Sequence, residues 1–209
     1  MDILKIETEL KKRLDIPYLW GMKQNDVYDT MTNFIYNVTD FDELLGTIKE
    51  RFEKKERYGV VYNYAMNRWF NFWSAHAIEY IFCSMPNVIP AKNKNDKLVD
   101  FEIQGLRFDH KTTVYPKKYT KTLKEAKANP MDLVGWLYEN QSQQKRMHLK
   151  NRLFIVLHAR NGKHWKLKAE ITWLKGLIEK YINNFDTKNL IRYNINGNEV
   201  IADIIWGVK

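Results

Sequence analysis

Apolar residues recur every three or four positions over several stretches of the chain, and this spacing predicts amphipathic helices. Residues 64–85 differ, because they are apolar on nearly all sides and rich in aromatic side chains. That pattern is typical of a helix buried in a core, and Pro86 marks its end. The helices predicted in this way cover residues 3–14, 40–55, 64–85, 131–148 and 172–185.

Elsewhere the apolar residues alternate with polar ones, or form short continuous runs, and these patterns predict strands. Gln104-Gly105, Asn161-Gly162 and Asn196-Gly197 are turn dipeptides that separate such runs. The predicted strands cover residues 97–103, 106–114, 151–159, 163–171, 190–195 and 199–206. Together with the helices they predict an α/β fold with a mixed central sheet flanked by helices.

The chain of 209 residues is long enough for one domain of good size. It has 9 Gly and 5 Pro, and no repeat or low-complexity tract marks a linker. We therefore predict a single domain. Its parts are a helical extension (1–60), a core (64–158), and appended hairpins with a helix (159–209).

The chain carries 34 Lys and Arg against 25 Asp and Glu, a formal net charge of +9. An excess of this size favours a polyanionic partner, either nucleic acid or an anionic membrane surface. The single cysteine, Cys83, excludes an internal disulfide and a cysteine-based zinc site, and its apolar surroundings predict a buried, inert thiol. No apolar stretch has the length of a signal peptide or a membrane span, so we expect a cytoplasmic protein.

The hairpin predicted around Gln104-Gly105 concentrates ionisable residues on one face. Counting outward from the turn pairs Glu102 with Arg107, an ordinary cross-strand ion pair. The next polar pair is Asp100 with Asp109, and like charges directly across a sheet are destabilising. A positive charge should compensate, from Lys111 on the same face or from a divalent cation. Oxygen ligands without cysteine suit Mg²⁺, Mn²⁺ or Ca²⁺. The alternative is a solvated strand face in a different register.

Glu79 is the only carboxylate between Arg57 and Asn95, and it lies within the most apolar predicted helix. A carboxylate in such a place needs a partner. The partner is either Arg68 or a nearby tyrosine, or the helix packs beside the hairpin and directs Glu79 to the same cation.

A helical Glu, a strand Asp and an Asp-x-Lys on the next strand resemble the PD-(D/E)xK nuclease superfamily, which has the restriction-endonuclease-like fold. By this resemblance Asp100 matches the first motif, Asp109-His110-Lys111 the second, and Glu79 the helical acid. The core order of helix, three strands, helix and strand is similar to residues 64–158.

The resemblance implies a site that holds one or two Mg²⁺ ions, with Mn²⁺ able to substitute. It implies Asp100, Asp109, Glu79 and the backbone carbonyl of His110 as metal ligands, and Lys111 as the residue that positions the attacking water. The side chain of His110 should lie on the opposite face of the strand, against the core.

Two basic segments with interleaved aromatic residues are candidates for contacts with phosphate groups. The first follows the hairpin and the second surrounds Asn161-Gly162, where we expect a β-ribbon. Their candidate residues are Lys117, Lys118, Lys121, Arg160, Lys163 and Lys166.

These features lead to the hypothesis of a Mg²⁺-dependent DNA endonuclease, of the type II restriction class or a repair or mobile-element enzyme, acting on double-stranded DNA. A homodimer is expected if the enzyme cuts both strands of a symmetric site. The first alternative is a non-catalytic nucleic-acid-binding protein on the same fold. The second is a structural protein whose charge is incidental and whose aromatic residues form an interface.

Overall fold

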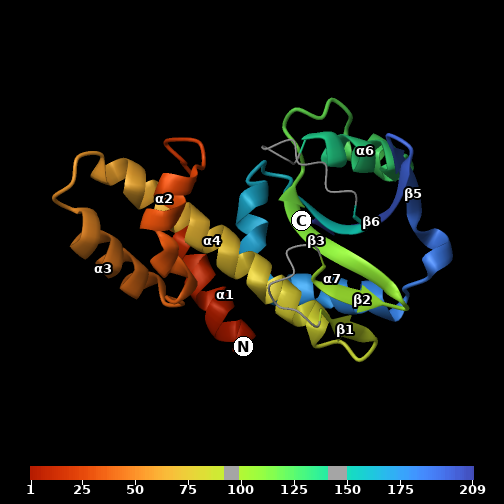
Figure 1. Cartoon of the computed structure of the whole chain (residues 1–209), viewed down its shortest axis with the longest axis horizontal. Helices are drawn as coiled ribbons and strands as arrows, with labels where there is room; N and C mark the ends of the chain where they lie inside the picture. The colour runs from red at the N-terminus through yellow and green to blue at the C-terminus, as the bar shows by residue number, and fades with distance from the viewer. Residues whose placement is uncertain (92–98, 141–149) are drawn as a thin grey trace. The chain divides into compact units, whose positions relative to one another are not determined.

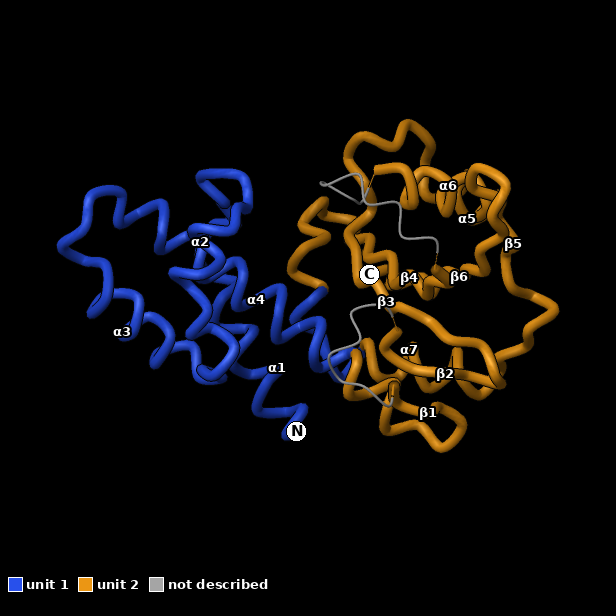
Figure 2. The backbone as a smooth tube through the Cα atoms, in the orientation of Figure 1, with its two compact units in different colours: residues 1–78, 168–173 blue, residues 79–167, 174–209 orange. Residues whose placement is uncertain are grey.

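A computed structural model describes residues 1–91, 99–140 and 150–209 of the chain. These residues form two compact units (Figure 2), one of residues 1–78 with 168–173 and one of residues 79–167 with 174–209. The boundary falls inside the long helix α4 (Tyr58–Cys83), whose last turn, from Glu79 onward, belongs to the second unit. We describe each unit by itself.

The first unit is helical. Its elements are α1 (Ile3–Lys12), η1 (Arg13–Asp15), α2 (Asp26–Met31), η2 (Asn33–Tyr36), α3 (Phe41–Phe52) and most of α4. The helices predicted at 3–14 and 40–55 are confirmed, and Asp40 caps α3 by accepting a hydrogen bond from the Glu43 N–H. The apolar α4 is buried here as expected, since the indoles of Trp69 and Trp73 donate to the backbone carbonyls of Val38 and Ile35.

The second unit contains a six-stranded mixed sheet in the order β1-β2-β3-β4-β6-β5. β1, β2 and β3 form an antiparallel meander, β3, β4 and β6 are parallel to one another, and β5 is antiparallel to β6. The strands are β1 (Val88–Pro90), β2 (Phe101–Ile103), β3 (Leu106–Val114), β4 (Arg152–His158), β5 (Ile191–Ile195) and β6 (Asn198–Val208).

Helices cover both faces of this sheet (Figure 1). On one face lie α5 (Leu123–Ala128) and α6 (Pro130–Asn140), and the ring of Tyr138 packs edge-on against Phe154 of β4. On the other face lies α7 (Ile171–Asn183), where the Tyr181 hydroxyl donates to Asp203 of β6. An α/β fold with a mixed sheet flanked by helices is therefore confirmed. None of the described helices is both long and apolar enough to cross a lipid bilayer.

Most predicted strands are confirmed, but one is wrong. Residues 163–171 form the 3₁₀ helix η3 (His164–Ala169) and not the second strand of a ribbon. A hairpin partner for β4 would need a free edge beside it, and β3 and β6 occupy both edges. The chain turns at Gly162 (φ +74°) instead, and His164 Nδ1 accepts a hydrogen bond from the Ala159 N–H. The end of the predicted helix 131–148 and the start of the strand 97–103 lie outside the described residues.

Candidate active site at the β2–β3 hairpin

The three pairs of the β2–β3 hairpin nearest the turn are those that the sequence predicts. The predicted pair of Asp100 with Asp109 is not formed, because β2 begins at Phe101 and the Asp100 N–H donates to the Phe108 carbonyl. Glu102 lies opposite Arg107, and the strands are joined by Gln104 (φ +48°) and Gly105 (φ +81°). These positive φ values are those of a tight two-residue hairpin turn, which explains why the Gln-Gly pair fixes the register. The Glu102 and Arg107 side chains form the expected ion pair, with 3.7 Å between Oε2 and Nε.

Asp109 lies in the middle of the sheet and is held by two cationic side chains. Its Oδ1 accepts a hydrogen bond from Lys111 Nζ at 2.8 Å, and its Oδ2 lies 3.2 Å from Arg152 Nε. Arg152 is the first residue of β4, directly beside Asp109 in the parallel pairing, and its guanidinium lies 5.2 Å from the ring centre of Tyr138. Lys111 remains 47% exposed, whereas Asp109 and Arg152 are buried. Only Lys111 therefore connects this group to the solvent.

Asp100 immediately precedes β2. At this position its carboxylate, and not its main chain, accepts the hydrogen bond from the His110 N–H of β3. Its Oδ2 accepts two hydrogen bonds, each 2.7 Å, from the backbone N–H and the ring Nδ1 of His110. Burial alone would raise the pKa of Asp100, but the hydrogen bonds from His110 and the charges of His110 and Lys111 lower it. The Asp100 carboxylate is thus held ionised, and Lys111 acts on both aspartates.

The His110 ring points to the face opposite Asp109, as predicted. It is buried between two aromatic rings, 6.2 Å from Phe101 and 6.0 Å from Phe82 of α4. In a strand the N–H and the C=O of one residue point to the same side. Because the His110 N–H points to Asp100, its carbonyl lies on the Asp100 side of β3 as well. The His110 carbonyl and Asp100 therefore lie on the same side of β3, as expected if both bind the same metal ion.

Glu79 begins the last turn of α4, which packs on the hairpin. In this contact the ring centres of Phe82 in α4 and Phe101 in β2 are 4.5 Å apart. The pKa of the Cys83 thiol, one turn further along the helix, is affected by two carboxylates. Its pKa is raised to about 11, first by burial and then by the charges of Glu79 and Asp100. Glu79 and Asp100 thus lie within electrostatic range of the same atom. Cys83 is half-buried and not fully buried as the sequence predicts, and its raised pKa disfavours the reactive thiolate.

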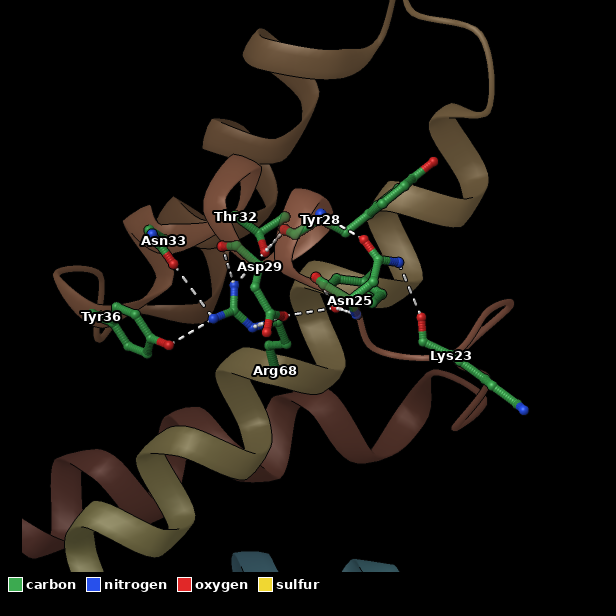
Figure 3. A network of polar contacts seen from close by, with 9 residues as sticks. Lys23, Asn25, Tyr28, Asp29, Thr32, Asn33, Tyr36 and Arg68 are labelled. Atoms are coloured by element: carbon green, nitrogen blue, oxygen red, sulfur yellow. Dashed lines mark hydrogen bonds and ion pairs between the residues drawn. The ribbon is translucent and has the colours of Figure 1, made fainter. Parts of the chain in front are cut away.

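Arg68 is not the partner of Glu79. Figure 3 shows its guanidinium within the first unit, where it donates to Thr32, Tyr36 and the Asp29 backbone carbonyl, each at 2.6 Å. Its Nε pairs with the Asp29 carboxylate at 3.1 Å. These acceptors occupy the guanidinium, so the predicted alternative of a Glu79–Arg68 salt bridge is wrong. The alternative of a tyrosine partner stays open.

The candidate ligands have the donor atoms that a hard divalent cation prefers, although no three His, Cys, Asp or Glu side chains of the described residues form a group that could hold a metal ion. Asp100, Asp109, Glu79 and the His110 carbonyl offer oxygen atoms alone. Oδ1 of Asp100 accepts no hydrogen bond from the described part of the chain, so it has a free lone pair. Both oxygens of Asp109 have cationic partners, and the positive charge beside each oxygen disfavours a bound ion unless one of the partners moves away. The exposed, flexible Lys111 is the partner that releases more easily, because Arg152 is buried.

The predicted phosphate-binding residues of the two basic segments meet at the carboxyl ends of the parallel strands. The segment after β3 carries Lys117 and Lys118, and the turn after β4 carries Arg160 and Lys163. Lys117 lies close enough to His164, in the second segment, for its charge to lower the pKa of that histidine. Lys166 lies in η3 with its ammonium 5.7 Å from the Trp165 ring centre. Lys121 differs from the others, because it pairs with Asp132 at 2.8 Å.

Sequence reasoning missed Arg152 and the pair of histidines His158 and His164, whose ring centres are 4.7 Å apart. An arginine that opens an otherwise apolar strand is a signal that could have identified Arg152, because a buried guanidinium needs an acid. The two histidines lie six positions apart, and only the turn at Gly162 brings them together.

Comparison with known proteins adds no relative: no protein-family model, no curated protein and no solved structure matches this chain.

Proposed function

We propose that this protein is a Mg²⁺-dependent nuclease that hydrolyses phosphodiester bonds in DNA, with Asp100, Asp109, Lys111 and Glu79 at its centre. The observation that supports this most is the contact between Lys111 and Asp109. The two side chains lie on one face of β3, 2.8 Å apart, with Lys111 also acting on Asp100. Two carboxylates beside an accessible ammonium can bind a divalent cation and stabilise the charge that develops in phosphoryl transfer.

The order of elements also supports the proposal. A helix (α4), a three-stranded antiparallel meander (β1, β2, β3), a helix (α6) and a parallel strand (β4) follow one another, with β4 beside β3. This is the order of the restriction-endonuclease-like core. The same order places an acid at the end of the first helix, before the second strand, and within the third strand. Those are the positions of Glu79, Asp100 and Asp109.

Each residue has a role that follows from its surroundings. Asp100 and Asp109 would hold the ion with the His110 carbonyl, and a bound Mg²⁺ supplies Lewis-acid stabilisation of the charge that develops on the phosphate. Lys111 donates hydrogen bonds from a flexible, half-exposed side chain, so it orients the attacking water and stabilises the developing charge. Glu79, whose charge acts on Cys83 together with that of Asp100, would supply a further carboxylate to the cation.

Arg152 serves as a positioning residue in this arrangement. Its buried guanidinium lies 3.2 Å from Oδ2 of Asp109 and fixes the position of that oxygen. Its side chain is held in turn against Tyr138 of α6. The carboxylate therefore has a defined orientation before any ligand arrives, which lowers the cost of assembling the site.

A cleavage assay tests the proposal. Purified protein is incubated with supercoiled plasmid, single-stranded DNA or RNA, each in EDTA, Mg²⁺ or Mn²⁺. Plasmid cleavage should need the metal, and Lys111→Met, Asp100→Asn and Glu79→Gln should each lower the rate, Lys111→Met by about 100-fold or more. Glu102→Gln on the same hairpin is the matched control and should cleave at the wild-type rate. Wild-type protein that cleaves none of the substrates with either metal would rule out the nuclease.

The second candidate is a nucleic-acid-binding protein without catalysis. The observation that favours it is the contact of each Asp109 oxygen with a cationic side chain, Lys111 or Arg152, because these charges already neutralise the carboxylate. In this case the protein binds DNA in EDTA and in Mg²⁺ alike and never cleaves it, and the Lys111→Met variant binds as the wild type does.

A further inference from the structure

The carboxyl ends of β3, β4 and β6 form an edge of the second unit where exposed cations gather. β3, β4 and β6 are parallel, so all three strands end on the same side of the sheet. The Tyr115 N–H donates to the Leu157 carbonyl, and the Arg160 N–H donates to the main-chain oxygen of Lys209. These hydrogen bonds keep the three chain segments side by side beyond the strands (Figure 2). We call the exposed cations there, Lys117, Lys118, Arg160 and Lys163, the basic edge.

The two halves of the basic edge come from loops 40 residues apart in the sequence, and histidine contacts join them. The Tyr115 ring packs edge-on against His158 at 5.4 Å, and His158 lies 4.7 Å from His164. Burial, then His158, then the charge of Lys117 lower the pKa of His164. Lys117 is therefore close to the turn that carries Arg160 and Lys163.

No Asp or Glu side chain of the described part of the chain forms an ion pair with the basic edge. None of its four side chains forms an ion pair or a hydrogen bond with another described residue, whereas Lys121 nearby is paired with Asp132. In the same place Nδ1 of His158 is buried and has no hydrogen-bond partner among residues 1–91, 99–140 and 150–209. Four unpaired cations at the carboxyl ends of parallel strands, the usual location of ligands in α/β sheets, are suited to an anion.

We propose that the basic edge binds backbone phosphates of the DNA substrate about five nucleotides away from the bond that is hydrolysed. The distance between the basic edge and the proposed active site follows from β3. Val114, the last residue of this strand, lies five residues beyond Asp109, and the basic edge begins after it. Five residues of strand span about 17 Å. Consecutive phosphates of one DNA strand advance by about 3.4 Å along the duplex, so about five of them cover this distance. This inference rests on the proposed function, because the distance is counted from Asp109 as the site of hydrolysis.

Binding in EDTA tests the edge without the chemistry. The probe is a fluorescein-labelled 20-base-pair DNA duplex, and anisotropy gives the affinity over a range of NaCl concentrations. The test variant replaces Lys117, Arg160 and Lys163 by Ala. The control variant replaces Lys23, Lys54 and Lys188 by Ala and loses the same charge at exposed sites elsewhere. Thermal unfolding followed by circular dichroism checks that both variants fold.

The test variant should bind the duplex at least about tenfold more weakly than the control variant. The plot of log affinity against log salt concentration should become less steep by about 2 to 3, since each lost phosphate contact removes about 0.9 from the slope. Equal affinities of the two variants would overturn the proposal, as would a wild-type protein that binds anionic lipid vesicles and not the duplex.

A second readout separates this inference from the proposed function. If the protein cleaves DNA, the test variant should lose kcat/KM on a 20-base-pair duplex and keep the wild-type value on thymidine 5′-p-nitrophenyl phosphate, which cannot reach the edge. If no substrate is cleaved, the binding measurement in EDTA still decides whether the basic edge holds DNA.

Discussion

Arg152 Nε lies 3.2 Å from Asp109 Oδ2, and both side chains are more than nine-tenths buried. The two residues are adjacent in the parallel pairing of β3 with β4, so the sheet itself brings them together. A buried ion pair contributes little net stability, but removing one partner leaves a charge in a medium that solvates it poorly.

Arg152→Met should therefore lower the free energy of unfolding by about 3–5 kcal/mol, measured by urea denaturation. The matched control is Arg192→Met, which breaks the exposed pair between Arg192 and Glu199 and should change stability by no more than about 1 kcal/mol. Equal losses in the two variants would show that the Arg152–Asp109 pair is not desolvated as described.

Arg68 should have the same importance in the first unit. Its guanidinium is buried on α4 and is bound by Asp29, Thr32 and Tyr36. Arg68→Met leaves these polar groups without their donor, so we expect a loss of about 3–5 kcal/mol by urea denaturation. Lys54→Met on the exposed surface is the control. A change below 1 kcal/mol for Arg68→Met would contradict the network of Figure 3.

Two helical glycines should respond to alanine with opposite signs. A Cβ at Gly135 of α6 would lie 2.6 Å from the Tyr193 hydroxyl oxygen, so Tyr193 must move out of its stacking with Tyr138. Gly135→Ala should destabilise by about 1–3 kcal/mol. Gly176 of α7 has open space around it, and Gly176→Ala should stabilise by about 0.5–1 kcal/mol. Stabilisation by both substitutions would show that α6 and β5 are not packed this closely.

His164 should make the protein less stable in mild acid. Its pKa in the folded state is lowered from 6.5 by burial, by His158 and by Lys117. The unfolded chain therefore takes up a proton first, and the stability that neutral His164 contributes declines as the pH falls below about 6.5. Urea denaturation between pH 7.5 and 5 should show this decline, and His164→Asn should reduce it. An unchanged pH dependence in the variant would refute the assignment.

The β2–β3 hairpin is the part of the fold that the sequence predicts best. Strict alternation fixes which residues share a face, and Gln104-Gly105 fixes the register, so the pairs around the turn are predicted correctly. The same alternation places the His110 ring in the core. What alternation does not predict is the rotation of the Asp100 side chain toward His110, because that depends on where β2 ends.

Other elements escaped prediction for identifiable reasons. β1 has three residues and ends with Pro90, which a strand tolerates at the edge of a sheet but which carries no strand signal. α5 begins with a capping box of Thr122 and Glu125, a signal that the surrounding lysines obscured. η3 was mistaken for a strand, since the absence of a free edge beside β4 is a property of the whole sheet and not of residues 163–171.

The most direct test of the central claim is the rate at which Asp109→Asn nicks supercoiled plasmid in Mg²⁺, relative to wild type and to the surface control Asp186→Asn. Asp109→Asn preserves the shape of the side chain and removes the charge that holds Lys111 and would hold the ion. We predict that Asp109→Asn lowers the nicking rate at least about 100-fold, because removing one group that stabilises the transition state costs roughly 10²–10³-fold. Asp186→Asn should nick at the wild-type rate. None of the three proteins should nick plasmid in EDTA. Asp109→Asn that nicks plasmid as fast as the wild type would contradict the assignment of the β2–β3 hairpin as the active site.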